Sequence, residues 1–129
     1  MKNLLIVISC LFCLGCSPEK MVNKKLQGEW KLTAINNEKI NSGYDKSILF
    51  TPNGKGGDIQ TTEITNNINV TKSGIYSIIK YDPITFAFPN DSLGSGYETE
   101  VYNITKSTTS ELILTQIGNN NKMYTYIKK

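Results

Sequence analysis

Trp30-Lys31-Leu32-Thr33-Ala34 alternates apolar and polar side chains along the chain. Successive side chains of a β-strand point to opposite faces of a sheet, so this alternation predicts a strand with one buried face. The same period of two runs through Ile84-Thr85-Phe86-Ala87-Phe88, whose three large residues share one face. No segment has a convincing helical period. We therefore predict an all-β fold.

Other strand-like segments follow at a spacing of about 8–12 residues. They include Ser47–Thr51, the weaker segments Asp58–Ile64 and Ile68–Lys72, and the clear segment Gly74–Tyr81. We predict eight antiparallel strands that close into an up-and-down barrel, because closure removes the sheet edges that would otherwise pair with other chains.

Asparagine-rich segments are predicted to form the turns, since Asn and Gly tolerate the positive φ of hairpin turns. These segments are Asn36-Asn37, Asn53-Gly54, Asn66-Asn67 and Gly118–Asn121. The last of them separates Glu111–Ile117 from Lys122–Lys128 as a hairpin.

The strand faces also predict the inside of the barrel. The residues placed inward are Trp30, Leu32, Phe50, Tyr76, Ile78, Phe86, Phe88, Tyr102, Leu112 and Leu114. An interior of eight strands is either filled by side chains or left open for one small ligand. If it is open, the predicted contacts to a small apolar ligand are Trp30, Phe50, Tyr76, Phe86, Phe88 and Tyr102.

The composition excludes several classes of function. The 129 residues contain no histidine, and all 14 basic residues are lysine, so the usual general base and the bidentate phosphate-binding side chain are absent. The three cysteines all lie within the first 16 residues. We predict neither an enzyme nor a metal or cofactor site. The formal charge of +3 is too small and too evenly spread to predict nucleic-acid binding.

The N-terminus carries the pattern of an export signal. Lys2 precedes the uncharged run Leu4–Leu14, and a helix of that length spans roughly 17 Å, well short of a ~30 Å hydrocarbon core. Where the run ends, Cys13-Leu14-Gly15-Cys16 resembles the bacterial lipobox. That resemblance implies a cleaved signal peptide over residues 1–15, a lipid-bearing Cys16, a polar tether over residues 16–25 and a folded domain over residues 26–129.

The lipobox resemblance leaves one alternative cysteine and indicates a destination. Val7-Ile8-Ser9-Cys10 also matches the pattern, but the apolar run before it is too short for a signal peptide. In lipoproteins of this kind the cysteine carries acyl chains such as palmitate, which anchor the protein to a membrane of the cell envelope. Ser17, rather than Asp, follows Cys16, which favours the outer membrane over the inner one.

Leu26-Gln27-Gly28-Glu29-Trp30 resembles the start of lipocalin-like domains, where a Gly-x-Trp opens the first strand. Gly74-Ile75-Tyr76 and the C-terminal Tyr124–Lys128 are similar to the short lipocalin-like lipoproteins of Bacteroidota. The resemblance implies a small barrel whose tryptophan closes one end. The META-type envelope domain shares the Trp-x-Leu opening, but its Gly-Cys-Asn motif is absent.

Two further patterns concern single sites. Asp91-Ser92-Leu93 resembles the O-glycosylation site of exported Bacteroidota proteins, which implies a glycan on Ser92. Glu98 and Glu100 project from the same strand face. We interpret that face as solvated rather than as an acid–base pair.

Two functions are compatible with these predictions. The first is a membrane-anchored barrel that binds a small apolar ligand. The second is a filled barrel that docks another envelope component, whose identity the sequence does not indicate. An enclosed apolar cavity of several hundred cubic ångströms would favour the first function. A packed interior with an exposed apolar patch would favour the second.

Overall fold

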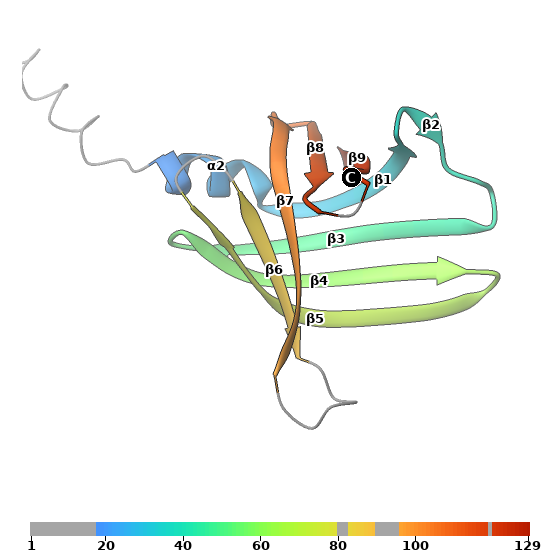
Figure 1. Ribbon diagram of the computed structural model, residues 1–129, viewed down its shortest axis with the longest axis horizontal. Helices are drawn as coiled ribbons and strands as arrows, with labels where there is room; N and C mark the ends of the chain where they lie inside the picture. The colour runs from blue at the N-terminus through green and yellow to red at the C-terminus, as the bar shows by residue number, and fades with distance from the viewer. Residues whose placement is uncertain (1–17, 80–82, 90–95, 119) are drawn as a thin grey trace, which may run out of the picture.

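The computed structural model describes residues 18–79, 83–89, 96–118 and 120–129. These residues form one α-helix followed by nine β-strands (Figure 1). The elements are α2 (Pro18–Leu26), β1 (Gly28–Ile35), β2 (Glu38–Lys39), β3 (Tyr44–Asn53), β4 (Gly56–Thr65), β5 (Ile68–Ile78), β6 (Ile84–Pro89), β7 (Tyr97–Ser107), β8 (Glu111–Gln116) and β9 (Met123–Lys128). The predicted all-β class is confirmed.

The strands close into a barrel. From β3 onwards each strand pairs antiparallel with the next, and β1 pairs with both β3 and β9. The two-residue β2 forms only a short hairpin with the end of β1, so β1 and β3 to β9 make the wall. The predicted eight-stranded antiparallel barrel is therefore confirmed.

Three of the predicted turns are hairpin turns built on consecutive asparagines. Both residues of each pair have positive φ. Asn36-Asn37 and Asn66-Asn67 are two-residue loops between paired residues, as in a type I′ turn, whereas Asn120-Asn121 lies in the longer connection between β8 and β9. The pairs are Asn36-Asn37, Asn66-Asn67 and Asn120-Asn121, with φ between 47° and 68°. Asparagine tolerates this conformation better than other residues with a side chain. Six of the asparagines of the chain therefore lie in connections between strands, in a conformation that few other residues adopt.

Strand β5 differs from the sequence prediction. Ile68–Lys72 and Gly74–Tyr81 were predicted as separate strands, but β5 runs without interruption from Ile68 to Ile78. At Gly74 a Cβ atom would lie 2.2 Å from the carbonyl oxygen of Ala87 on β6, so only glycine fits this close approach. Pairing with β6 covers only Ile75–Ile78, and beyond it β3, β4 and β5 extend together past β6 and β7 (Figure 1).

The core fills the barrel around its aromatic side chains. The ten residues that the strand faces placed inward are all buried, together with Leu26, Ile48, Ile59, Ile84 and Tyr126. The ring centroids of Phe50 and Tyr76 lie 5.1 Å apart, and those of Phe86 and Tyr102 also lie 5.1 Å apart. Such contacts add about 0.5–1.5 kcal/mol per pair beyond the burial of apolar area.

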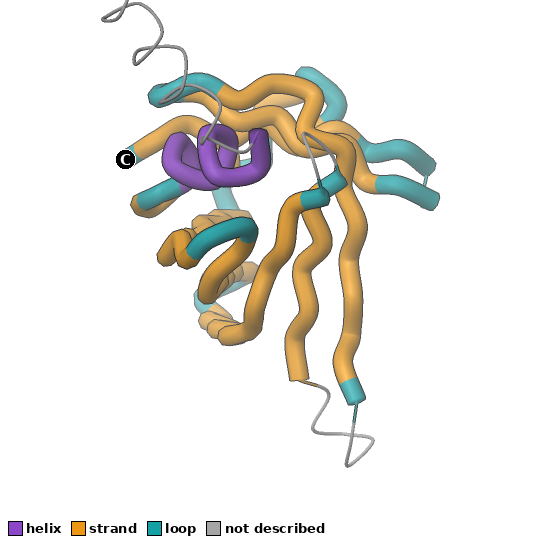
Figure 2. The backbone as a smooth tube through the Cα atoms, turned by 90° about the vertical axis from the view of Figure 1, so that its left-hand side faces the viewer, coloured by secondary structure: helices purple, strands orange, loops and turns teal. Residues whose placement is uncertain are grey.

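Helix α2 closes one end of the barrel, where Figure 2 shows it lying across the strands. The prediction of a polar tether over residues 16–25, with no helix in the chain, is wrong from Pro18 onwards. Val22, Asn23 and Leu26 share the face that packs on the barrel, and the Trp30 indole nitrogen donates a 2.8 Å hydrogen bond to the Leu26 carbonyl oxygen. Residues 18–25 therefore belong to the folded unit.

Candidate functional site

The barrel interior changes from apolar to polar with distance from α2. Side chains two residues apart on a strand share a face, so the inward positions can be followed from the core outward. They read Phe50-Ile48-Lys46-Tyr44 on β3, Ile59-Thr61-Glu63 on β4 and Tyr102-Glu100-Glu98 on β7. Across the strand pairs, Lys46 lies opposite Glu63 and Thr61 lies opposite Lys72. Three strands thus become polar or charged at the same level.

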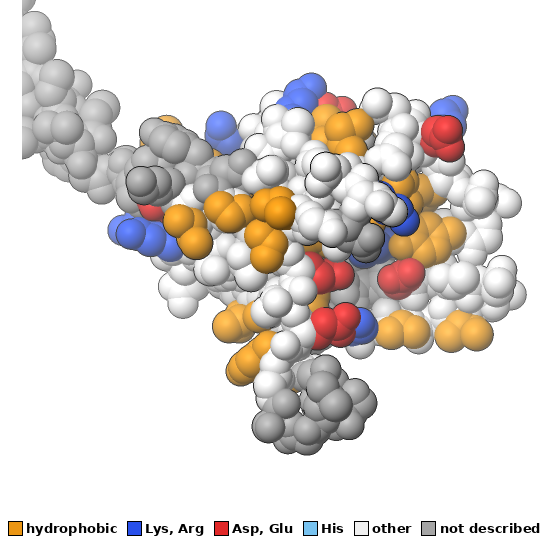
Figure 3. Space-filling view, viewed as in Figure 1, with side chains coloured by type: hydrophobic (Ala, Val, Ile, Leu, Met, Phe, Trp, Pro, Cys, Tyr) orange, Lys and Arg blue, Asp and Glu red, His pale blue; other side chains and the backbone are white. Residues whose placement is uncertain are grey.

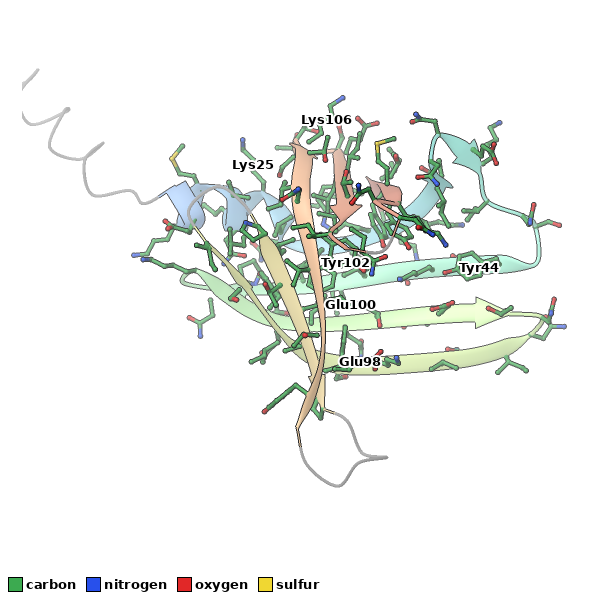
Figure 4. All side chains as sticks on the ribbon, viewed as in Figure 1. Lys25, Tyr44, Glu98, Glu100, Tyr102 and Lys106 are labelled. Atoms are coloured by element: carbon green, nitrogen blue, oxygen red, sulfur yellow. The ribbon has the colours of Figure 1, made fainter. Side chains whose placement is uncertain are left out.

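We call this open end of the barrel the mouth. It comprises Tyr44, Lys46, Thr61, Glu63, Val70, Lys72, Phe88, Glu100, Tyr102 and Tyr124. In Figure 4, Tyr102, Glu100 and Glu98 follow one another along β7, and Tyr44 lies further out along β3. Figure 3 shows acidic side chains gathered where β7 passes in front of β3, β4 and β5. The two walls of the mouth come from these two parts of the sheet.

A small cavity of about 50 Å³ lies within the mouth. That volume holds a few water molecules or one small hydrophilic group, since a single water needs roughly 10–15 Å³. Its charged lining consists of Lys46 and Lys72 against Glu63 and Glu100, two charges of each sign that cancel. Thr61, Val70 and Phe88 complete the lining. The cavity therefore offers hydrogen-bond donors and acceptors without a net charge.

Two tyrosines of the mouth hydrogen-bond its carboxylates. Burial raises the pKa of Tyr44, and the charge of Glu63, together with a hydrogen bond to it, raises that pKa further. Burial likewise raises the pKa of Tyr102, followed by the charge of Glu100 and a hydrogen bond to it. Both hydroxyl groups remain protonated at neutral pH and act as donors.

The two lysines of the mouth have different partners. The Nζ atom of Lys46 lies 5.7 Å from the centroid of the Tyr124 ring, within the range of a cation–π contact. The Nζ atom of Lys72 lies 3.6 Å from a carboxylate oxygen of Glu98, and both side chains are about half exposed. An exposed pair of this kind stabilises the fold by only about 0–1 kcal/mol, so Lys72 can exchange Glu98 for another partner at little cost.

The predicted apolar-ligand contacts divide between core and mouth. Trp30, Phe50, Tyr76 and Phe86 are at most 3% exposed and lie within the packed core. Phe88 lines the mouth cavity, and Tyr102 lies at the boundary between core and mouth. Of the six, Phe88 alone lines the cavity, and Tyr102 contacts Glu100 of its lining. Two larger hollows, of about 610 and 660 Å³, are open to solvent beside the β1–β2 hairpin and share Tyr44 with the mouth.

Most mouth residues were missed from the sequence, although a signal was present. Lys46 and Tyr44 continue the alternation of Ile48 and Phe50, and extending that strand outward would have placed both inside the barrel. Glu100 was interpreted as part of a solvated face, but it shares its face with the buried Tyr102 and lines the cavity. Glu98 is exposed and Glu100 is half-buried, so the expected solvated face describes Glu98 better than Glu100.

Other predicted sites cannot be placed. Cys16, the signal peptide over residues 1–15 and Ser92 lie outside the described residues. Within the described part of the chain, no three His, Cys, Asp or Glu residues gather closely enough to hold a metal ion. No helix among the described residues is both long and apolar enough to cross a membrane.

Comparison with known protein families gives no match, and comparison with curated proteins gives none either. Among solved structures, a redesigned β-barrel is similar to this chain with a TM-score of 0.57 and 12% sequence identity. The match covers 84% of this chain and 95% of the redesigned barrel. At this identity the likeness shows the closed-barrel fold alone.

Proposed function

We propose that this chain is a lipoprotein of the bacterial cell envelope that binds a small hydrophilic ligand at the mouth of its barrel. The observation that carries the proposal is the change of the inward positions from apolar to charged at one level of the barrel. Glu63 and Lys72 are exposed, but Lys46 and Glu100 are half-buried, where a charged group costs free energy unless it is paired. We infer that the polar lining is retained for recognition.

The lining also indicates the class of ligand. The cavity of about 50 Å³ has room for only one polar group, so it would receive a hydroxyl or ammonium group of a larger molecule whose remainder lies in the open mouth. The charges of the cavity lining cancel, which favours a molecule without net charge, namely a polyol such as a sugar or a zwitterion such as an amino acid. Hydroxyl or ammonium groups of the ligand would donate to Glu63 and Glu100, and oxygen atoms would accept from Lys46 and Lys72. The ring of Phe88 gives the ligand one apolar surface. We place the ligand here because the core beneath the mouth is filled.

The membrane anchor is the second part of the proposal. It is supported by the lipobox-like Gly15-Cys16 and by the apolar run that precedes it. We propose that acyl chains on Cys16 hold the barrel at the envelope, at the outer rather than the inner membrane. A role in catalysis is not proposed, because the chain has no histidine and no cysteine beyond Cys16.

A second candidate function is a filled barrel that docks another envelope component. The packed core favours it, as do the exposed apolar side chains of Ile68 and Val70, which are 67% and 49% exposed on the extended part of β5. Because Val70 also lines the mouth cavity, a docking partner would cover the mouth, and its charged lining would contact that partner instead of a small ligand.

A ligand screen separates these functions. The thermal stability of the mature protein is measured with uncharged monosaccharides, with zwitterionic amino acids and with palmitic acid as the apolar comparison. We expect a member of one of the first two classes to raise the unfolding temperature, because a ligand that binds only the folded state stabilises it. A shift with palmitic acid alone would support the apolar ligand instead, and no shift with any class would support the docking protein.

A pair of variants assigns the binding to the mouth. Glu100→Gln removes a carboxylate of the cavity and should weaken binding about tenfold, the equivalent of roughly 1.4 kcal/mol for one charge-assisted hydrogen bond. Glu29→Gln is the matched control, since Glu29 is exposed and pairs with Lys129 away from the mouth. Equal affinities of the two variants would show that the ligand binds elsewhere.

A further inference from the structure

The outward face of α2 carries lysines and one methionine. Residues on a helix are separated by about 100°, so the residues that alternate with the barrel-facing Val22 and Leu26 point to solvent. These outward residues are Lys20, Met21, Lys24 and Lys25, all of them exposed, and Met21 is 58% exposed. Glu19, the acidic residue of α2, is half-buried in its first turn. The exposed surface of the helix is therefore basic with a single apolar side chain.

The turn between β3 and β4 extends this basic surface. The Asn23 side-chain nitrogen donates hydrogen bonds of 3.0 and 2.7 Å to the carbonyl oxygens of Gly54 and Gly56, which places the exposed Lys55 beside α2. The Lys55 carbonyl in turn accepts a 2.9 Å hydrogen bond from the amide of Ile78. Ile79, the next residue, is 59% exposed. The closed end thus adds a fourth lysine and a second apolar side chain.

We propose that this end of the barrel rests on an anionic lipid surface. The docking face comprises Lys20, Lys24, Lys25 and Lys55 with Met21 and Ile79. Each lysine held near an anionic membrane strengthens binding about fivefold. Exposed apolar side chains among the lysines enter the headgroup region, as they do in interfacial helices.

The position of Cys16 in the sequence favours a membrane as the surface that contacts the docking face. This step rests on the proposed anchor. Cys16 lies two residues before Pro18, the first residue of α2. Two residues span at most about 7 Å, which is shorter than the ~8 Å over which charges are screened at physiological salt. A lipid on Cys16 would therefore hold the first turn of α2 within electrostatic reach of the headgroups, and Lys24 and Lys25 come within reach when the helix lies along the membrane surface.

Docking in this way would direct the mouth away from the membrane. Strand β3 begins at Tyr44 in the mouth and ends at Asn53 beside the docking face. Its 10 residues span about 33 Å. Figure 1 shows α2 at one end of the molecule and the start of β3 at the other. The ligand site would then face the aqueous compartment.

Quenching of tryptophan fluorescence tests the orientation. The chain has one tryptophan, the fully buried Trp30, so a second tryptophan reports on its own surroundings. Met21→Trp places it on the docking face, and Ile68→Trp is the matched control at the far end of β5, where the side chain is 67% exposed. Each lipidated protein is reconstituted into phosphatidylcholine–phosphatidylglycerol vesicles that contain a lipid with a nitroxide near its headgroup.

We expect at least twofold quenching at Met21→Trp and none beyond the Trp30 signal at Ile68→Trp. Adding Lys24→Gln and Lys25→Gln to Met21→Trp should reduce the quenching while the protein still sediments with the vesicles. Protein that sediments but shows equal quenching at both positions would overturn the docking face and leave the anchor intact. Protein that does not sediment would overturn both, and neither result bears on ligand binding at the mouth.

Discussion

The hydroxyl group of Tyr76 on β5 donates a hydrogen bond to the side-chain oxygen of Asn23 on α2. Asn23 is only 1% exposed, and its side-chain nitrogen donates to the carbonyl oxygens of Gly54 and Gly56. One buried amide thus joins the helix to the β3–β4 turn and to the barrel core. Burying the amide costs little free energy because its donors and its acceptor are all paired.

Replacing Asn23 should loosen the helix from the barrel. Asn23→Ala leaves the Tyr76 hydroxyl and the two turn carbonyls without their partner, at a cost of about 1–3 kcal/mol for each group that water cannot reach. Tyr76→Phe leaves only the Asn23 oxygen unpaired and should cost less. Urea unfolding measures both free energies. If Asn23→Ala unfolds at the same urea concentration as the natural protein, α2 does not pack as described.

A side chain at position 74 should disturb the point where β5 leaves β6. Gly74→Ala would bring a Cβ to 2.2 Å from the Ala87 carbonyl oxygen and 2.9 Å from the Phe88 ring, so the strands must separate. We expect a loss of about 1–3 kcal/mol in the free energy of unfolding, as for other overpacked sites. Gly43→Ala is the control, because its Cβ would have an ordinary 3.4 Å contact and should change stability by less than about 0.5 kcal/mol. Equal losses would show that β5 and β6 are not this close.

The strands and the core were predictable because each depends on local alternation. Trp30 and Leu32, or Phe86 and Phe88, identify a buried face within a single strand, and all are buried. The asparagine turns were predictable for the same reason, since positive φ is a property of the turn residues themselves. These features needed no information about distant parts of the chain.

The helix and the position of Glu100 were missed because both depend on distant partners. Asn23 is polar, and its burial is explained only by partners far along the chain, namely two carbonyls of a turn about 30 residues away and the hydroxyl of Tyr76. Val22 and Leu26 alone are too few to reveal a helical period. Glu100 has the same alternation as a solvated strand residue, and only barrel closure places it near Lys46 and Glu63. The set of residues that line the cavity therefore depends on the tertiary structure.

The choice of anchoring cysteine has a direct test in cells. Lipid on Cys16 predicts that Cys16→Ser abolishes incorporation of labelled palmitate, because the lipid attaches through that sulfur. Cys10→Ser and Cys13→Ser change neighbouring thiols and serve as controls that should still be labelled. Loss of labelling in Cys10→Ser, with labelling kept in Cys16→Ser, would assign the anchor to the upstream Val7–Cys10 pattern instead.

The buried tyrosines should make the fold sensitive to alkaline pH. Burial raises the pKa of Tyr126 well above its ordinary value of 10.0. Burial and the charge of Glu100 likewise raise the pKa of Tyr102. Below about pH 10 the folded and the unfolded chain both keep these protons, so the free energy of unfolding has its full value. Above it the unfolded chain loses them first, and stability falls by up to about 1.4 kcal/mol per pH unit for each tyrosine.

Comparing Tyr102→Phe with the natural protein isolates one such proton. The variant cannot ionise at position 102, so its free energy of unfolding should fall less steeply above about pH 10. The difference in slope should be up to about 1.4 kcal/mol per pH unit, the value for one proton. Urea unfolding across the alkaline range measures both slopes. Tyr97→Phe is the control, because Tyr97 is 63% exposed. Parallel curves for Tyr102→Phe and the natural protein would mean that Tyr102 ionises equally in both states, and the mouth would then be open to water at that level.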